Sequence, residues 1–248
     1  MNQNKHIVKE FDLELQKLDN LIAELGGLAE RQLADSVDAL VRRDAERAQE
    51  IVSADERLDG LEREIDSLGI DMLIRRQPMA NDLRLVVAAL KTSSILERIG
   101  DYAKNIAKRT IALSQMPNVG STRSVVRMAD RTQSQIKMAL DAYLNRDADL
   151  AEDVRASDQE IDSLHTSLFR ELLTYMMEDP RNITACTHLM FVAKNLERMG
   201  DHATSVAENL LFLVHGQSPD DERPKRDAAH YTVMEPNGPD EDETESKD

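Results

Sequence analysis

The sequence carries one short block twice: Leu-Glu-Arg-Ile-Gly-Asp at residues 96–101 and Leu-Glu-Arg-Met-Gly-Asp at residues 196–201. Upstream of these blocks the offset between matching residues becomes 103, because Arg43-Asp44-Ala45 matches Arg146-Asp147-Ala148. The three-residue difference falls in a turn between two predicted helices, where a change of loop length costs little free energy. Internal similarity over this distance predicts a duplicated structural unit. We therefore expect two related halves.

The composition favours helices throughout. The chain has 248 residues, of which 41% are hydrophobic and only 3% aromatic, and its commonest residues are good helix formers. Apolar residues recur at spacings of three and four, which is the period of an amphipathic helix. Asp44 and Asp147 are placed to cap helices, and prolines at 78, 117 and 180 end them. The predicted helices cover about residues 4–42, 44–76, 80–115, 125–145, 147–179 and 180–215.

These helices predict an all-α fold of two tandem, pseudo-symmetric three-helix bundles. The first bundle is expected at residues 1–116 and the second at 121–216. Residues 217–248 hold four of the seven prolines, eleven acidic and four basic side chains, and little apolar spacing. This composition predicts a disordered acidic tail.

Charge and hydropathy exclude several classes of protein. The formal net charge of −16 argues against a nucleic-acid partner, because binding to phosphates needs a basic surface. The single cysteine, Cys186, excludes an intramolecular disulfide and is expected to pack in the core. The longest apolar run, residues 85–90, is far shorter than a membrane span, and residues 1–6 do not resemble a signal peptide. We expect a soluble, cytoplasmic protein.

Each half contains two pairs of carboxylates at positions i and i+4, a spacing that places both side chains on one helix face. If neighbouring helices bring the two pairs together, a cation would be needed to offset the repulsion between them. Oxygen ligands favour hard ions such as Mg²⁺, Ca²⁺, Mn²⁺ or iron, with Zn²⁺ as a further candidate. The pairs are Asp55 with Asp59, Glu97 with Asp101, Asp158 with Asp162, and Glu197 with Asp201.

A simpler interpretation treats the same carboxylates as solvated helix faces with weak local ion pairs. Lys104 and Lys108 support it in the first half, whereas Thr204 and Glu208 stand at the matching positions of the second. His165 replaces Glu62 and is either an additional ligand or an exposed histidine without a role.

Two further features of the sequence leave alternatives open. Gly100 and Gly200 lie inside helices, where glycine costs about 1 kcal/mol relative to alanine, so they indicate either close helix approach or a tolerated small residue. The turn around residue 78 gathers positive charge on an acidic chain and is a candidate surface for a partner or a phosphate, or else a capped turn with solvated arginines. Its charged residues are Arg75, Arg76, Asp82 and Arg84.

Four segments together resemble the PhoU family of bacterial phosphate-signalling proteins. They are residues 76–84, 96–101, 172–180 and 193–203, and the similarity extends over about residues 5–216. The resemblance implies two three-helix bundles and a cytoplasmic negative regulator of the phosphate-starvation response that also modulates phosphate uptake. It implies two partners, the ATPase subunit of the high-affinity phosphate ABC transporter and a sensor histidine kinase, so that contact with the membrane is only through partners.

The resemblance also bears on chemistry and assembly. The family's metal-binding pattern, Glu or Asp followed by Asp four residues later, maps onto the four carboxylate pairs given above. Family members are often homodimers, and catalysis is not expected. The alternatives from other classes are a metal-dependent enzyme or metal store that uses these carboxylates, and a helical scaffold.

Overall fold

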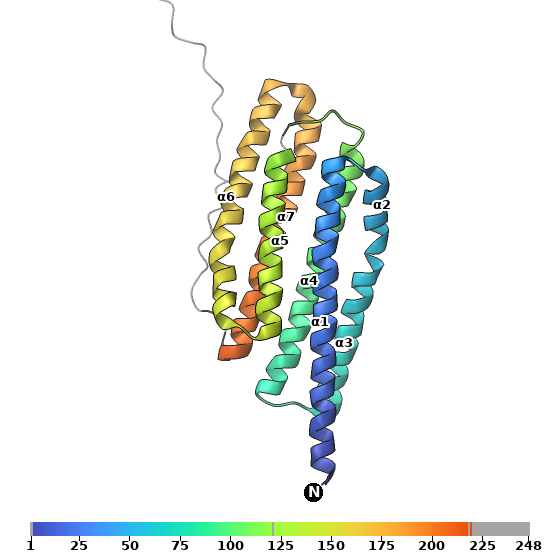
Figure 1. The fold of residues 1–248 in the computed structure, drawn as a ribbon, viewed down its shortest axis with the longest axis vertical. Helices are drawn as coiled ribbons and strands as arrows, with labels where there is room; N and C mark the ends of the chain where they lie inside the picture. Colours follow the sequence, from blue (N-terminus) through green and yellow to red (C-terminus); the bar gives the residue numbers. More distant parts are fainter. Residues whose placement is uncertain (1, 121, 218, 220–248) are drawn as a thin grey trace, which may run out of the picture.

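The computed structural model describes residues 2–120, 122–217 and 219, with side chains from residue 10 onward. This part of the chain is helical, without strands, which confirms the predicted all-α fold (Figure 1). The helices are α1 (Asn2–Arg42), α2 (Ala45–Ala54), α3 (Glu56–Arg76), α4 (Asn81–Leu113), α5 (Thr122–Asn145), α6 (Ala148–Glu178), a short 3₁₀ turn η1 (Pro180–Asn182) and α7 (Ile183–His215). The predicted tail at 217–248 lies outside the described residues except for Gln217 and Pro219.

The single helix predicted over residues 44–76 is wrong, because the structure divides it into α2 and α3 at Asp55. Asp55 keeps helical dihedrals, with φ −61° and ψ −29°, so the break is slight. It falls where the Asp55 carboxylate turns into the interior and accepts a hydrogen bond from Gln32 Nε2 at 3.1 Å. The matching helix of the second half, α6, runs through the equivalent residue Asp158 without a break.

Two equivalent turns begin the flanking helices of the two halves. Asp44 accepts a hydrogen bond from the backbone N–H of Arg47 at 2.9 Å, and Asp147 accepts one from Leu150 at 3.0 Å. Both predicted caps are therefore confirmed, each satisfying an N–H that the helix leaves unpaired. The residues before them, Arg43 and Arg146, both have φ 57°. The duplication thus extends to backbone conformation.

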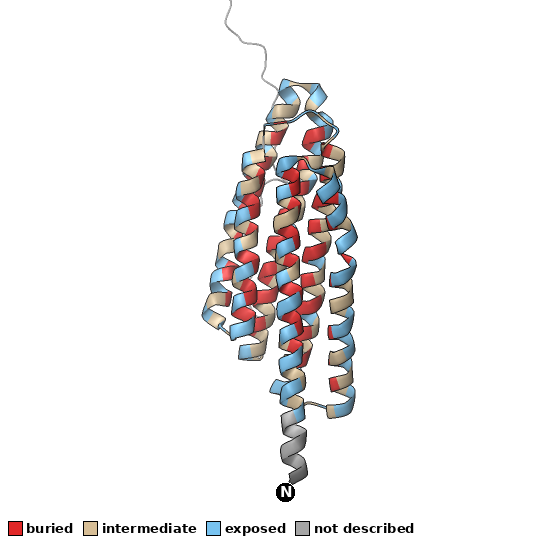
Figure 2. Ribbon diagram, turned by 45° about the vertical axis from the view of Figure 1, so that its right-hand side comes forward, coloured by how far each residue is buried: buried red, intermediate tan, exposed pale blue. Residues whose placement is uncertain are grey.

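The helices form two packed layers. α4 lies against α7 and α1 against α5, while α2 and α3 flank one side and α6 the other (Figure 1). The buried residues face inward along all the long helices (Figure 2). One hydrophobic core runs through both halves, joining Leu25 and Leu96 of the first to Ile136 and Leu196 of the second. No helix in the described part of the chain combines the length and hydrophobicity needed to cross a bilayer.

Candidate carboxylate sites

The first carboxylate site lies where α2 and α3 meet, against α4. Asp55 is 4% exposed and bonds both Gln32 of α1 and Lys104 of α4. Lys104 Nζ also lies 3.3 Å from Asp101 Oδ1. The ammonium group of Lys104 therefore bridges one carboxylate from each of the two predicted pairs.

Glu97 shows that the predicted carboxylates of this half converge. Its pKa is raised to about 7, first by burial and then by the negative charges of Asp101, Glu62, Asp59 and Asp55. The other three predicted carboxylates are therefore close enough to Glu97 to raise its pKa. Glu62, which is on α3 like Asp59, acts on Glu97 in the same way. Burial disfavours a charged carboxylate, and neighbouring anions disfavour it further.

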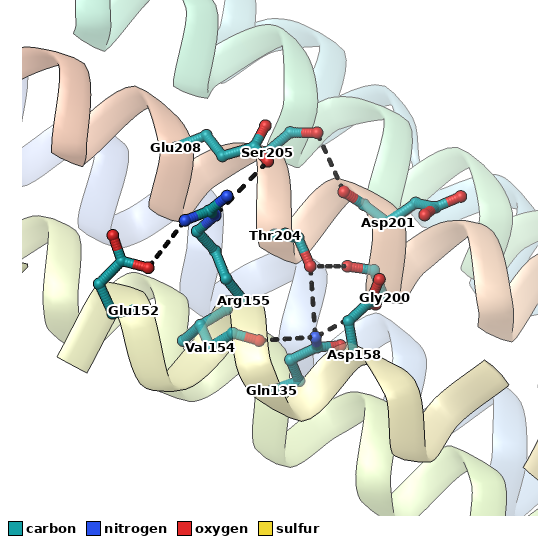
Figure 3. A network of polar contacts seen from close by, with 10 residues as sticks. All are labelled: Gln135, Glu152, Val154, Arg155, Asp158, Gly200, Asp201, Thr204, Ser205 and Glu208. Carbon is teal, nitrogen blue, oxygen red and sulfur yellow. Dashed lines mark hydrogen bonds and ion pairs between the residues drawn. The ribbon is translucent and has the colours of Figure 1, made fainter. Parts of the chain in front are cut away.

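The second site is more deeply buried. Asp158, Asp162 and Glu197 are 2%, 3% and 6% exposed, and Asp201 is half-buried. Gln135 of α5 donates to Asp158 Oδ1 at 3.4 Å, as drawn in Figure 3. His165 is 5% exposed, so the expectation of an exposed histidine is wrong: it lies on the inner face of α6.

The cationic side chains near the carboxylates differ between the two halves. In the second half Lys194 Nζ lies 2.8 Å from Glu197, and Arg155 of α6 lies 2.8 Å from Glu152 and 3.9 Å from Glu208 (Figure 3). Offsets of 103 and 100 place Val52 at the position of Arg155 and Lys108 at that of Glu208. The repeat has therefore preserved the carboxylates while their cationic neighbours diverged.

Gln32 and Gln135 are functional candidates that reasoning from the sequence missed. They occupy equivalent positions, are 7% and 1% exposed, and each donates its amide to the first aspartate of its half. Each also has a buried Oε1 without a hydrogen-bond partner among the described residues. The available signal was the irregularity at Gln32 in the apolar stripe of α1.

Gly100 and Gly200 lie where neighbouring side chains approach the helix backbone closely at these sites. A Cβ at position 100 would lie 2.6 Å from Leu58 Cδ2, and one at position 200 would lie 3.0 Å from both Gln135 Oε1 and Ile161 Cδ1. The close-approach interpretation is confirmed, because a side chain at either position would displace groups that line the site.

The donor chemistry of these sites suits a hard cation, since carboxylate oxygens and a buried amide oxygen come together. Among the described residues, no group of three or more His, Cys, Asp or Glu side chains is arranged to hold a metal ion. In the first half Lys104 already links Asp55 to Asp101. The assignment of metal to the eight carboxylates remains a prediction.

The arginines of the basic turn between α3 and α4 each bind different nearby residues. Arg76 is held by Glu14 and Glu10 of α1, each at 3.1 Å. Arg75 pairs with Asp71, Arg84 bonds Asn81, and Asp82 is exposed in the first turn of α4. The ion pairs of Arg76 therefore connect α3 to α1. Arg75, Asp82 and Arg84 are exposed or half-buried.

Large apolar side chains are exposed at the turn of each helix hairpin. At the α3–α4 end, Ile74 and Leu83 are 68% and 41% exposed, and their equivalents at the α6–α7 end, Met177 and Ile183, are 57% and 48% exposed. The two hairpin ends lie at opposite ends of the molecule (Figure 1). We call them the first and second hairpin ends.

Comparison with known proteins agrees with the fold and the repeat. The family model described as "PhoU domain" matches residues 22–110 and again 125–210. Two proteins called phosphate-specific transport system accessory protein PhoU homolog, from Rhizobium meliloti and Caulobacter vibrioides, are each 50% identical over 224 residues, which is 90% of this chain and 94% and 97% of theirs.

Solved structures give the same result. PhoU from Pseudomonas aeruginosa superposes with a TM-score of 0.80 at 39% identity, over 84% of this chain and all of that one. The phosphate transport system regulatory protein PhoU from Streptococcus pneumoniae superposes with a TM-score of 0.78 at 27% identity, over 85% and 99% of the two chains. The chain belongs to the PhoU family.

Proposed function

We propose that this chain is a negative regulator of the phosphate-starvation response and a modulator of phosphate uptake. It acts in the cytoplasm, without catalysis of its own, as an adaptor between the ATPase subunit of a phosphate ABC transporter and a sensor histidine kinase. The relatives' description as accessory proteins of phosphate-specific transport supports the role in regulating transport.

The observation that carries the adaptor role is the pair of exposed hairpin ends. Exposed apolar side chains that gather at one place typically mark a surface for protein partners. Ile74 and Leu83 are exposed at the first end, and Met177 and Ile183 are exposed at the second. Because the ends point away from each other, one chain can hold two partners at once.

The two hairpin ends differ in charge, which supports two different partners. The first end carries Arg75 and Arg84 with Asp82, whereas the second carries Glu178 and Asp179 with Arg181. Electrostatic complementarity selects between partners more than it adds affinity. The proposed mechanism is conformational: the state of the transporter alters docking at one end, and docking biases the kinase toward its phosphatase-competent form. The core shared by both halves provides a packed connection between the ends.

Binding of Mg²⁺, Mn²⁺, iron or Zn²⁺ at the carboxylate sites belongs to the same proposal. The raised pKa of Glu97 supports it, because a bound cation would offset the repulsion that opposes ionisation there. In this role the cation stabilises the contacts of α3 with α4, or of α6 with α7, and supplies no chemistry. A homodimer is also part of the proposal, and light scattering of the purified chain tests it.

A pull-down with substitutions at each hairpin end tests the adaptor role. Ile74→Asn with Leu83→Asn alters the first end, and Met177→Asn with Ile183→Asn alters the second. Val214→Asn, at a 46% exposed position on α7, is the control. We expect the unaltered chain and the control to retain both the ATPase and the kinase, and each double variant to lose one partner and keep the other. If both double variants retain both partners, or the unaltered chain retains neither, the proposal is wrong.

A further inference from the structure

A stripe of cations and aromatic rings follows the line where α4 lies against α7. Each contact joins one helix to the other: Lys91 Nζ is 5.5 Å from the ring centroid of Phe212, Arg109 Cζ is 4.3 Å from that of Phe191, and Arg198 Cζ is 6.0 Å from that of Tyr102. These distances are within the range of cation–π attraction. We call these six residues the α4–α7 seam.

The pseudo-symmetric pair Tyr102 and His202 marks the middle of the seam. Their rings stack with centroids 5.5 Å apart and planes at 17°. The equivalent positions 91 and 191 hold Lys and Phe, so the stripe is not a simple copy of one half in the other. The seam therefore exists only where α4 of the first half packs against α7 of the second.

No carboxylate of the described part of the chain forms an ion pair with the cations of the seam. Within residues 10–120 and 122–217, Lys91, Arg109 and Arg198 form no ion pair, although Arg109 Nη1 lies 3.3 Å from His188 Nδ1. Lys91 and Arg198 are exposed, and the Phe191 ring is 49% exposed. On a chain of net charge −16, this surface is therefore suited to an acidic segment.

The tail of the same chain supplies such a segment. Residues 227–248 contain eight acidic side chains and one basic, whereas residues 217–226 contain three of each. The run Asp240-Glu-Asp-Glu243 concentrates the charge. The cations of the seam are opposite in sign to this segment.

The tail also leaves the bundle beside the seam and is long enough to cover it. α7 ends at His215, and the next residue, Gly216, has φ +80° and lies where a Cβ would overlap the guanidinium of Arg84 on α4. Arg84 precedes Lys91 by two helical turns. The 18 residues from Lys91 to Arg109 span about 27 Å of helix, whereas the 24 residues from Gly216 to Asp240 reach up to about 80 Å when extended.

We propose that the acidic segment 227–248 docks on the α4–α7 seam of its own chain. Its carboxylates pair with Lys91, Arg109 and Arg198, and Tyr231 supplies an aromatic ring for the same surface. The docked segment covers cations from both halves and competes with any acidic partner for them. The six seam residues belong neither to the hairpin ends nor to the four carboxylate pairs.

Carbodiimide cross-linking of the full chain tests the proposal, because it joins a lysine directly to a carboxylate in contact with it. An equal mixture of unlabelled and ¹⁵N-labelled chain distinguishes links within one chain from links between two. We expect Lys91 to link to residues 240–243 of its own chain, several-fold more than the exposed Lys137 on α5 does. Molar salt should reduce the links to the background level, because it screens surface charge.

A variant with altered seam residues provides a second test in the same cross-linking experiment. Arg109→Gln with Arg198→Gln keeps both Lys91 and the tail carboxylates, so the chemistry of cross-linking is unchanged, and circular dichroism checks that the helices remain. We expect the Lys91 links to fall several-fold. Equal labelling of Lys91 and Lys137, links found only between differently labelled chains, or links unchanged in the seam variant would each overturn the proposal.

Discussion

Replacing Glu97 with glutamine tests the electrostatics of the first carboxylate site. The pKa of Glu97 is raised from its ordinary 4.5 to about 7 in the folded chain. The folded state therefore binds the proton more tightly than the unfolded state. The stability contributed by the protonated form is complete below pH 4.5 and is lost as the pH rises through 7. A shift of this size corresponds to about 3 kcal/mol, which solvent screening of a half-buried group reduces to about 1–2 kcal/mol.

The measurement is thermal unfolding of the unaltered chain and Glu97→Gln at pH 5 and pH 8.5, in chelator. Glutamine preserves the shape of the side chain and removes its charge. We expect similar midpoints at pH 5 and, at pH 8.5, a midpoint about 3–6 °C higher for the variant. Glu56→Gln, an exposed position on α3, is the matched control and should show no such gain. A gain of equal size at both pH values, or a loss at pH 8.5, would refute the reasoning.

Three further predictions follow from the same sites. Lys104→Met should lower the free energy of unfolding at pH 7 by about 3 kcal/mol, because it leaves the buried Asp55 carboxylate without its ammonium partner; chemical denaturation measures this loss. Millimolar Mn²⁺ or Mg²⁺ at pH 8.5 should raise the midpoint of the unaltered chain and chelator should reverse the rise, whereas no change would contradict cation binding. Gly100→Ala should destabilise by about 1 kcal/mol because its Cβ would press on Leu58, while Gly60→Ala, which meets nothing within 4 Å, should stabilise by about 0.5–1 kcal/mol.

Much of the fold follows from local patterns in the sequence. The spacing of apolar residues located the long helices, and the caps at Asp44 and Asp147 located two of their starts, because both signals depend on neighbours along the chain. The i, i+4 carboxylates were recognised for the same reason. In the first half, the packing of adjacent helices brings the two carboxylate pairs near each other. The raised pKa of Glu97 reflects this, because the other three carboxylates contribute to it.

The features that were missed depend on contacts between distant segments. Gln32 bonds Asp55 across 23 residues, and nothing local distinguishes it from an exposed glutamine except its place in an apolar stripe. Lys104 was expected to form a weak local ion pair, but its bond to Asp55 depends on how α2 and α3 pack against α4. The break at Asp55 was missed as well, and the equivalent Asp158, which accepts a hydrogen bond from Gln135, lies in an unbroken helix.

The dependence on distant contacts also explains why the role of Arg76 in the basic turn was not predicted. Arg76 was grouped with Arg75 and Arg84 as a partner surface, yet it is only 21% exposed and binds two glutamates of α1. The exposed apolar residues of the hairpin ends were not recognised, because exposure is a property of the packed structure.

The central claim, that this chain represses the phosphate-starvation response, is tested most directly in a strain from which its gene has been deleted. The measurement is the transcript level of phosphate-starvation genes during growth with abundant phosphate, compared with the parent strain and with a strain in which the gene is restored. We predict high expression in the deletion strain and renewed repression when the gene is returned. Normal repression without the gene would contradict the account.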